Sequence, residues 1–498
     1  MIGLPAVVAV LLVVGATVVI GVYGLPVSRT TSDFLVASRS VGPGMNASAI
    51  CGEYLSAASF LGVAALVLLG GVDLLWLPIG YTAGYLVLLV LVAAPLRRSG
   101  AYTLPDFAEA RLGSPGLRRA TAALVVVIGW LYLLPQFHGA GLTLATVTGA
   151  PQWMGTAVLL GVVVAIVTAG GMRSITFTQA FQYALKLVAI TVPALVLVGV
   201  WHHRGSPDPF TGYWAVPLAD PRQAHPLYAT YSLVLATFVG TMGLPHVLVR
   251  FYTNPDGRAA RRTAVAVIGL LGLFYLWPPV YAALGRVYAP QLATPARADT
   301  LVLQLPVLML PGMVGRLLGA LLTAGAFAAF LSTASGLTVS VAGVLSQDLV
   351  TRRRGGVREF RLGAVVAAVV PAVAAVGLGD RVSLASAVGL AFAVAASTLC
   401  PLLVLGIWWA GLTARGAAAG LVVGTTTALA AVVATYAGVS STGWPAVLLA
   451  EPAAWTVPIA FAAAVVGSLT SPRGARGSTL PLLRLHAPES LLRADEAG

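Results

Sequence analysis

Apolar runs long enough to cross a lipid bilayer follow one another along almost the whole chain of 498 residues. A membrane-spanning helix needs about 20 consecutive apolar residues. Thirteen such runs lie at about 3–24, 44–70, 74–96, 119–147, 153–171, 174–201, 228–251, 263–288, 313–349, 361–379, 383–410, 414–437 and 453–470. We therefore expect an all-α integral membrane protein with about 13 transmembrane helices.

The composition excludes a water-soluble enzyme. Apolar residues make up 58% of the chain and charged residues only 9%, whereas soluble domains carry about 25% charged residues. The longest segments outside the runs, 202–228 and 471–498, are too short to form a core of their own. No His-Glu-x-x-His or Gly-x-Ser-x-Gly motif of an intramembrane enzyme occurs. Cys51 and Cys400 both lie in apolar runs and are expected to be core residues.

The positive charges mark orientation. The formal net charge is +13, and every cation except Lys186 is an arginine. With the N-terminus outside, 22 arginines lie on the inner side of the membrane and 6 on the outer side, as the positive-inside rule requires. We expect a multi-pass protein of the cytoplasmic membrane with an external N-terminus and a cytoplasmic C-terminus. The bilayer, and not a nucleic acid, explains the charge.

Two runs are interrupted at similar depths by glycine, proline and polar residues. The interruptions read Gly52-Glu53-Tyr54-Leu55-Ser56-Ala57-Ala58-Ser59 in run 44–70 and Gly240-Thr241-Met242-Gly243-Leu244-Pro245-His246 in run 228–251. Within hydrocarbon, such a break survives only where the freed backbone groups line a cavity or meet another helix. Glycine also permits close helix packing, and that alternative stays open for Gly240 and Gly243.

The interrupted runs lie five runs apart, so they cross the membrane in opposite directions. Matching breaks in two inverted repeats of five helices indicate the binding site of a secondary transporter. The expected organisation is an N-terminal extra span (1–30), a first inverted repeat (44–201), a second inverted repeat (228–410), two C-terminal extra spans (411–470) and a cytoplasmic tail (471–498).

Ionisable residues inside the runs are candidates for function. Glu53 is costly within hydrocarbon unless it is paired, hydrated or protonated. The alternative to a functional role is a protonated Glu53 that is hydrogen-bonded between helices. Lys186 lies about midway along run 174–201 and needs a partner or water. His246 and Arg250 share one helix face, where they either gate the inner side or contact an anion; Arg250 is alternatively an anchor at the inner interface.

Adjacent hydroxyls occur in the middle of run 313–349, at Ser332 and Thr333. Such hydroxyls often bond back to the carbonyl group four residues earlier. They also suit hard cations such as sodium, which prefer hydroxyl and carbonyl oxygens. Position alone leaves both interpretations open. The remaining candidates for substrate binding or gating are Tyr54, Ser56, Ser59, Gln136, Gln179 and Gly243.

From about Phe34 to Thr470 the sequence resembles the solute:sodium symporter family, and within it the cation/acetate symporter branch. The matching segments are Gly52-Glu53-Tyr54-Leu55-Ser56-Ala57-Ala58-Ser59-Phe60-Leu61-Gly62, Gly170-Gly171-Met172, Gly243-Leu244-Pro245-His246 with Arg250-Phe251, and Thr413-Ala414-Arg415-Gly416. The resemblance implies a LeuT-type fold of two inverted repeats and alternating access driven by sodium. In the branch, an Asp usually stands where this chain has Glu53.

The resemblance also implies a set of sodium ligands. They are the backbone carbonyls of Gly52 and Leu55, opposite Ala329, Ser332 and Thr333. A second cation position of the family, an Asp in some sugar-transporting members, falls on Gln179, which argues against a second sodium ion. The branch carries short monocarboxylates such as acetate and propionate.

The resulting hypothesis is a symporter that imports a short-chain monocarboxylate together with sodium. Half-helix N-termini at the breaks offer N–H groups to a carboxylate. The alternatives are a proton-coupled monocarboxylate transporter that uses Glu53, a sodium symporter for another small solute such as an amino acid, and a transporter-like sensor. No obligatory protein partner is expected.

Overall fold

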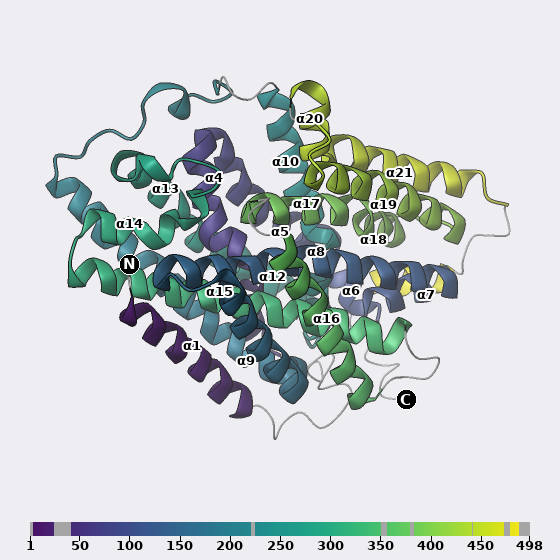
Figure 1. Cartoon of the computed structure of the whole chain (residues 1–498). Coiled ribbons are helices and arrows are strands. Elements are labelled where there is room, and N and C mark those ends of the chain that lie inside the picture. Colours follow the sequence, from purple (N-terminus) through teal and green to yellow (C-terminus); the bar gives the residue numbers. More distant parts are fainter. Residues whose placement is uncertain are drawn as a thin grey trace.

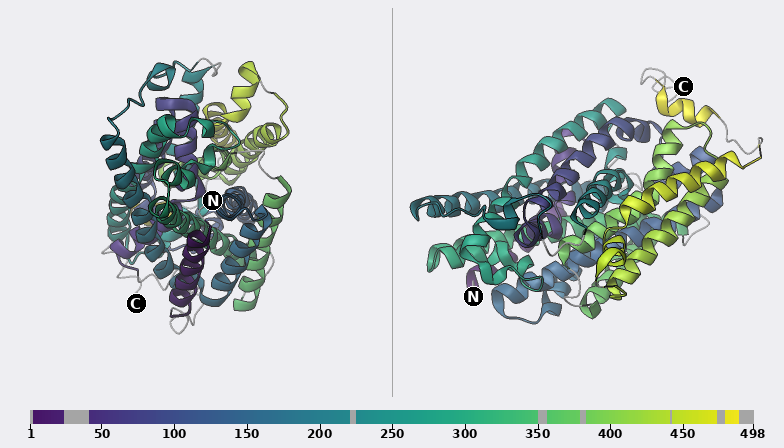
Figure 2. Two further views of the ribbon diagram at one scale, coloured as in Figure 1. Left: turned by 60° about the vertical axis from the view of Figure 1, so that its left-hand side comes forward. Right: turned by 90° about the horizontal axis from the view of Figure 1, so that it is seen from above.

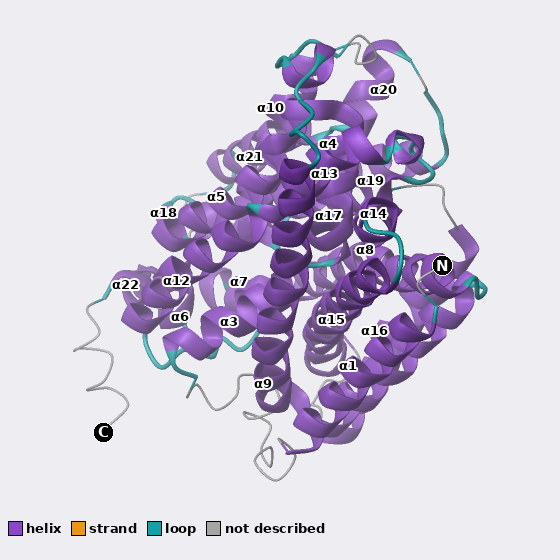
Figure 3. Ribbon diagram, turned by 90° about the vertical axis from the view of Figure 1, so that its left-hand side faces the viewer, coloured by secondary structure: helices purple, strands orange, loops and turns teal. Residues whose placement is uncertain are grey.

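The computed structural model describes residues 3–23, 41–220, 225–349, 356–378, 383–440, 442–472 and 479–487. Within these ranges the regular structure is helical and no strand occurs (Figure 3). The α-helices are α1 (Leu4–Tyr23), α3 (Pro43–Tyr54), α4 (Val63–Gly70), α5 (Trp76–Leu91), α6 (Ala93–Arg98), α7 (Leu104–Leu112), α8 (Pro115–Thr148), α9 (Gln152–His203), α10 (Pro226–Gly240), α11 (Pro245–Tyr252), α12 (Gly257–Tyr275), α13 (Trp277–Tyr288), α14 (Leu301–Met309), α15 (Met313–Val344), α16 (Val357–Leu378), α17 (Leu384–Ser397), α18 (Leu399–Trp408), α19 (Ala414–Tyr436), α20 (Gly443–Ala450), α21 (Ala453–Leu469) and α22 (Thr479–His486). The expected all-α class is confirmed.

Among the described residues, ten helical segments are long and apolar enough to cross a membrane, or up to twelve if each of two bent pairs is one span. The expected number was thirteen. The difference arises because the runs 44–70 and 74–96 contribute to one continuous candidate, Ala58–Leu91, of 34 residues. One straight α-helix of 34 residues would be about 51 Å long, more than a hydrocarbon core of about 30 Å. Gly71, with φ +75°, ends α4 within this segment.

The most deeply buried spans form the centre of the bundle. The candidate spans that contain α15 and α17 are 83% and 89% buried, and α15 packs against α1, α3, α8 and α9. By contrast, α1 is only 28% buried and lies at one edge, while α19 and α21 pack together at the opposite edge (Figures 1 and 2). The candidate site therefore lies among central helices that are shielded from lipid.

The break expected after Gly52 is present. Helix α3 ends at Tyr54, Leu55 has a non-helical ψ of 85°, and a π-helical turn at Ala58–Gly62 leads into α4. A Cβ atom on Gly52 would overlap the carbonyl oxygen of Gln179. Glycine is thus required here because α3 approaches the backbone of α9 closely.

The second break lies between α10 and α11, which are bent by 40°. Leu244 is extended, with φ −79° and ψ 114°, as the residue before a proline prefers. Cβ atoms on Gly240 and Gly243 would overlap the carbonyl groups of Phe392 and Ala395 in α17. The close-packing interpretation of these two glycines is therefore correct, and they lie at a true break as well.

Candidate functional site

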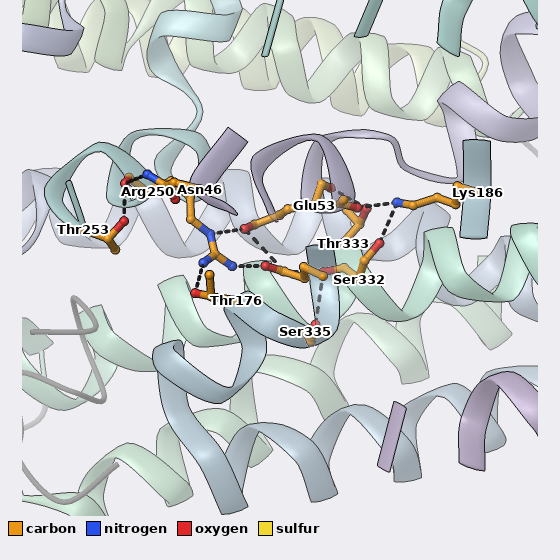
Figure 4. Close-up of polar contacts among 11 residues, drawn as sticks. Asn46, Glu53, Thr176, Lys186, Arg250, Thr253, Ser332, Thr333 and Ser335 are labelled. Carbon is orange, nitrogen blue, oxygen red and sulfur yellow. Dashed lines mark hydrogen bonds and ion pairs between the residues drawn. The ribbon is translucent and has the colours of Figure 1, made fainter. Parts of the chain in front are cut away.

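Glu53 at the first break is paired with Arg250 from the second broken helix. Arg250 Nε lies 2.7 Å from Glu53 Oε2, and the two side chains are 0% and 2% exposed. Arg250 also donates from Nη1 to Thr176 Oγ1 at 2.9 Å and from Nη2 to Gln179 Oε1 (Figure 4). A fully buried guanidinium does not fit the role of an interface anchor, so that alternative for Arg250 is wrong.

Gln179 connects this pair to α15. Its Nε2 donates to the backbone oxygen of Ser332 at 2.8 Å and lies 3.4 Å from Glu53 Oε2. Both ends of the amide are thus engaged. Gln179 stands at the position that the family resemblance relates to a second cation, and its amide is hydrogen-bonded to other protein groups.

The expected sodium ligands gather around the ammonium group of Lys186. Its Nζ donates to the Gly52 carbonyl, to the Leu55 carbonyl at 2.9 Å and to Ser332 Oγ at 2.8 Å (Figure 4). The Lys186 side chain is completely buried. The sequence indicated that Lys186 needs a partner, and the structure supplies three.

The other two expected ligands make different contacts. The carbonyl of Ala329 accepts a hydrogen bond from Ser332 Oγ at 3.0 Å, and Thr333 Oγ1 donates to the carbonyl of Glu53 at 2.6 Å. We refer to Glu53, Gln179, Lys186, Arg250 and Ser332 as the buried charge network. In this arrangement the three gathered oxygens are held by an ammonium group, so they do not fit a sodium ion at the same time.

A cluster of rings lies beside the same breaks. Its members, here called the aromatic cluster, are Tyr54, Tyr81, Tyr85, Tyr132, His246 and Phe392. Ring centroids are 5.0 Å apart for Tyr54 and Tyr85, 4.9 Å for Tyr81 and Phe392, and 5.0 Å for Tyr132 and His246. The cluster joins α3, α5, α8, α11 and α17.

Several polar atoms of the aromatic cluster are buried without a hydrogen-bond partner among the described residues. They are the hydroxyls of Tyr81 and Tyr85 and both ring nitrogens of His246. Leaving such groups unpaired costs about 1–3 kcal/mol each, and native proteins tolerate few of them. A small bound molecule with oxygen acceptors would satisfy the two hydroxyls and the N–H of the imidazole.

Some sequence candidates have a structural role at the break. Gln136 Oε1 accepts a hydrogen bond from the Ala57 N–H at 2.9 Å, which is one of the backbone groups that the break frees. Ser59 Oγ lies 2.8 Å from the hydroxyl of Tyr275, and Ser56 is buried at the break. Gly243 packs on α17. A role of these four residues in substrate binding or gating stays a prediction.

Sequence reasoning did not single out Tyr81, Tyr85, Tyr132 or Phe392. Tyrosine and phenylalanine in apolar runs resemble ordinary core residues. One available signal was the spacing of Tyr81 and Tyr85, because residues at i and i+4 lie on one helix face. Cys51 and Cys400 are buried and unbonded to each other, as expected of core residues.

Comparison with known proteins agrees with this architecture. A family model described as "Sodium:solute symporter family" matches residues 34–424. The "Uncharacterized symporter YwcA" of Bacillus subtilis is 31% identical over 481 residues, which cover 93% of each chain. A "Monocarboxylic acid transporter" of Corynebacterium glutamicum is 33% identical over 505 residues, which cover 92% of this chain and 90% of the relative.

A solved structure of similar fold is a Na⁺-coupled sialic acid symporter in a substrate-bound, outward-open state. It is 15% identical, covers 95% of this chain and 99% of its own, and superposes with a TM-score of 0.73. This likeness confirms the expected fold class, whereas the number of thirteen spans stays a prediction.

Proposed function

We infer, since the chain belongs to the sodium:solute symporter family, that it is a secondary active symporter that imports a short-chain monocarboxylate by alternating access. The family and its relatives are transporters and not enzymes. One observation carries the choice of solute: unpaired buried donors of the aromatic cluster lie beside two broken helices. A relative of 33% identity that is named as a monocarboxylic acid transporter supports it.

The chemistry of the aromatic cluster suits a small carboxylate. Tyrosine hydroxyls and an imidazole N–H donate hydrogen bonds, and the two oxygens of a carboxylate accept them. The rings of Tyr54, Tyr81 and Phe392 offer an apolar surface for a short alkyl chain. Arg250 is less suited to bind the solute, because its three nitrogens already donate to Glu53, Thr176 and Gln179.

The membrane arrangement belongs to the same proposal. We place the first inverted repeat at 44–201 and the second at 228–410. The protein lies in the cytoplasmic membrane, with its N-terminus outside the cell and its C-terminus in the cytoplasm. Arginines on the inner side support this orientation. A sodium ion at Gly52, Leu55 and Ser332 is not part of this function, because Lys186 holds these oxygens.

Uptake by proteoliposomes tests the proposed solute. The purified full chain is reconstituted, and inward gradients of both sodium and protons are imposed, so that the result does not depend on the coupling ion. We expect saturable uptake of [¹⁴C]acetate or [¹⁴C]propionate, each inhibited by the other. Uptake of proline or glucose in preference to both acids would contradict the proposal.

A further inference from the structure

Lys186 is the only lysine of the chain, and it lies at the centre of the bundle. Its ammonium group is completely buried and reaches from α9 to the break in α3 and to α15. Three oxygens from these two elements surround it: the carbonyls of Gly52 and Leu55 and the hydroxyl of Ser332. No carboxylate is among its hydrogen-bond acceptors in the described part of the chain.

The number and type of these contacts match an ammonium ion. An ammonium group has three N–H donors and no acceptor, and three oxygens accept from it here. A hard cation such as sodium selects the same kind of ligand, carbonyl and hydroxyl oxygen. The tethered ammonium and a free sodium ion would therefore compete for the same three atoms and carry the same charge.

The charges around Lys186 do not favour a second cation. The titratable groups that face it are Cys51 and Glu53, both on α3. The carboxylate of Glu53 is already paired with Arg250. A sodium ion added beside the ammonium would repel it in a medium of low dielectric constant. Gln179, at the other position that the family resemblance suggests, brings no negative charge.

We propose that the Lys186 ammonium is a tethered cation that occupies the position of the coupling ion between α3 and α15, so that this transporter binds no sodium there. The inference rests on the proposed function in taking the chain to be an ion-coupled transporter. A tethered cation changes the expected energetics of transport. The cation that links the broken helix to α15 is then part of the protein and is not released into the cell with the solute.

Direct binding of ²²Na⁺ to the purified full chain tests the proposal. We expect no saturable binding to the wild type at millimolar sodium. Lys186→Ala removes the amine and frees the three oxygens, so saturable binding should appear, and Lys186→Ala combined with Ser332→Ala should lose it again. Val188→Ala, on the same helix but 50% exposed, is the matched control and should behave as the wild type.

Saturable ²²Na⁺ binding to the wild type that Ser332→Ala abolishes would overturn the proposal. So would a Lys186→Ala protein that folds, as judged by its thermal unfolding, and binds no sodium. If Lys186→Ala cannot be purified, Lys186→Met replaces it. The wild-type measurement also decides by itself: absence of saturable binding, or binding that Ser332→Ala leaves unchanged, supports the proposal, and binding that Ser332→Ala abolishes overturns it.

Uptake separates this proposal from the proposed function. When choline replaces sodium, [¹⁴C]acetate uptake by the wild type should change by less than twofold. At least a tenfold loss of uptake in choline, together with wild-type ²²Na⁺ binding that Ser332→Ala abolishes, would overturn the tethered cation but leave the monocarboxylate function intact. Failure to carry either acid, together with the expected ²²Na⁺ pattern, would overturn the function and leave the tethered cation supported.

Discussion

The buried charge network and the aromatic cluster lie beside the same two helix breaks but differ in how their polar groups are satisfied. In the network, Arg250 and Lys186 direct their N–H groups to protein oxygens. In the cluster, the Tyr85 hydroxyl and the nitrogens of His246 have no partner among the described residues. The network is therefore satisfied within the protein except at Glu53 Oε1, which has no partner among the described residues, whereas the cluster leaves several donors unpaired. Substitutions should thus affect stability in the first and transport in the second.

The largest effect is expected for Arg250→Met. This change leaves the Glu53 carboxylate buried without its partner, which typically costs about 3–5 kcal/mol. Thermal unfolding in detergent should show a large loss of stability. The double variant Arg250→Met with Glu53→Leu replaces both charges and should recover at least half of the loss. A single variant as stable as the wild type would show that the pair is not part of the folded core.

His246→Leu should separate the two regions clearly. The substitution removes two nitrogens that have no partner within the described ranges, at similar volume, so the free energy of unfolding should be unchanged or higher. Uptake of [¹⁴C]acetate should fall by at least about tenfold, because one donor to the carboxylate is lost. His203→Leu, at an exposed position, is the control. Normal uptake by the His246 variant would remove this residue from the proposed site.

Tyr85→Phe deletes only a hydroxyl that has no partner in the described part of the chain. We expect KM for acetate to rise by about tenfold, which corresponds to the loss of one hydrogen bond to a charged acceptor. The unfolding temperature should equal that of the wild type. The corresponding change in the exposed Tyr231 serves for comparison. A drop in unfolding temperature without a change in KM would indicate that the hydroxyl supports the fold instead.

Tyr54→Phe should have the smallest effect, and it should lower stability instead of impairing transport. The Tyr54 hydroxyl lies 3.1 Å from the backbone oxygen of Tyr81 and 3.1 Å from Thr241 Oγ1. Its removal should lower the free energy of unfolding by about 1 kcal/mol, as measured by chemical denaturation. Stability equal to the wild type would mean that the bonded and unbonded hydroxyls of the cluster are equivalent.

The breaks themselves were predictable from the sequence, because Gly52 and Pro245 interrupt apolar runs where hydrocarbon forbids free backbone groups. The need of Glu53 and Lys186 for partners was predictable for the same reason. The partners were not, since Glu53 and Arg250 are 197 residues apart and their contact depends on the rotation of each helix. The family resemblance named the ligands that surround Lys186 but assigned them to sodium.

Gln136 and the aromatic cluster show what polarity and periodicity in the sequence do not predict. Gln136 was a candidate for solute contact because it is polar, yet polarity equally serves a freed backbone group such as the Ala57 N–H. Tyr81, Tyr85, Tyr132 and Phe392 of the aromatic cluster were missed, because the Tyr81 and Tyr85 hydroxyls stand out only through the partners that they lack among the described residues. Missing partners are a property of the packed structure and leave no periodic signal.

The hydrogen bond from the Ala57 N–H to Gln136 has a consequence for kinetics. Because a side chain replaces the lost helical bond, the helix is interrupted without a bound solute. If the proposed monocarboxylate binds at this break, its binding energy need not unwind the helix, so the association step avoids a folding barrier. The proposed function then predicts fast recognition and a slow step that lies in the movement of whole helices.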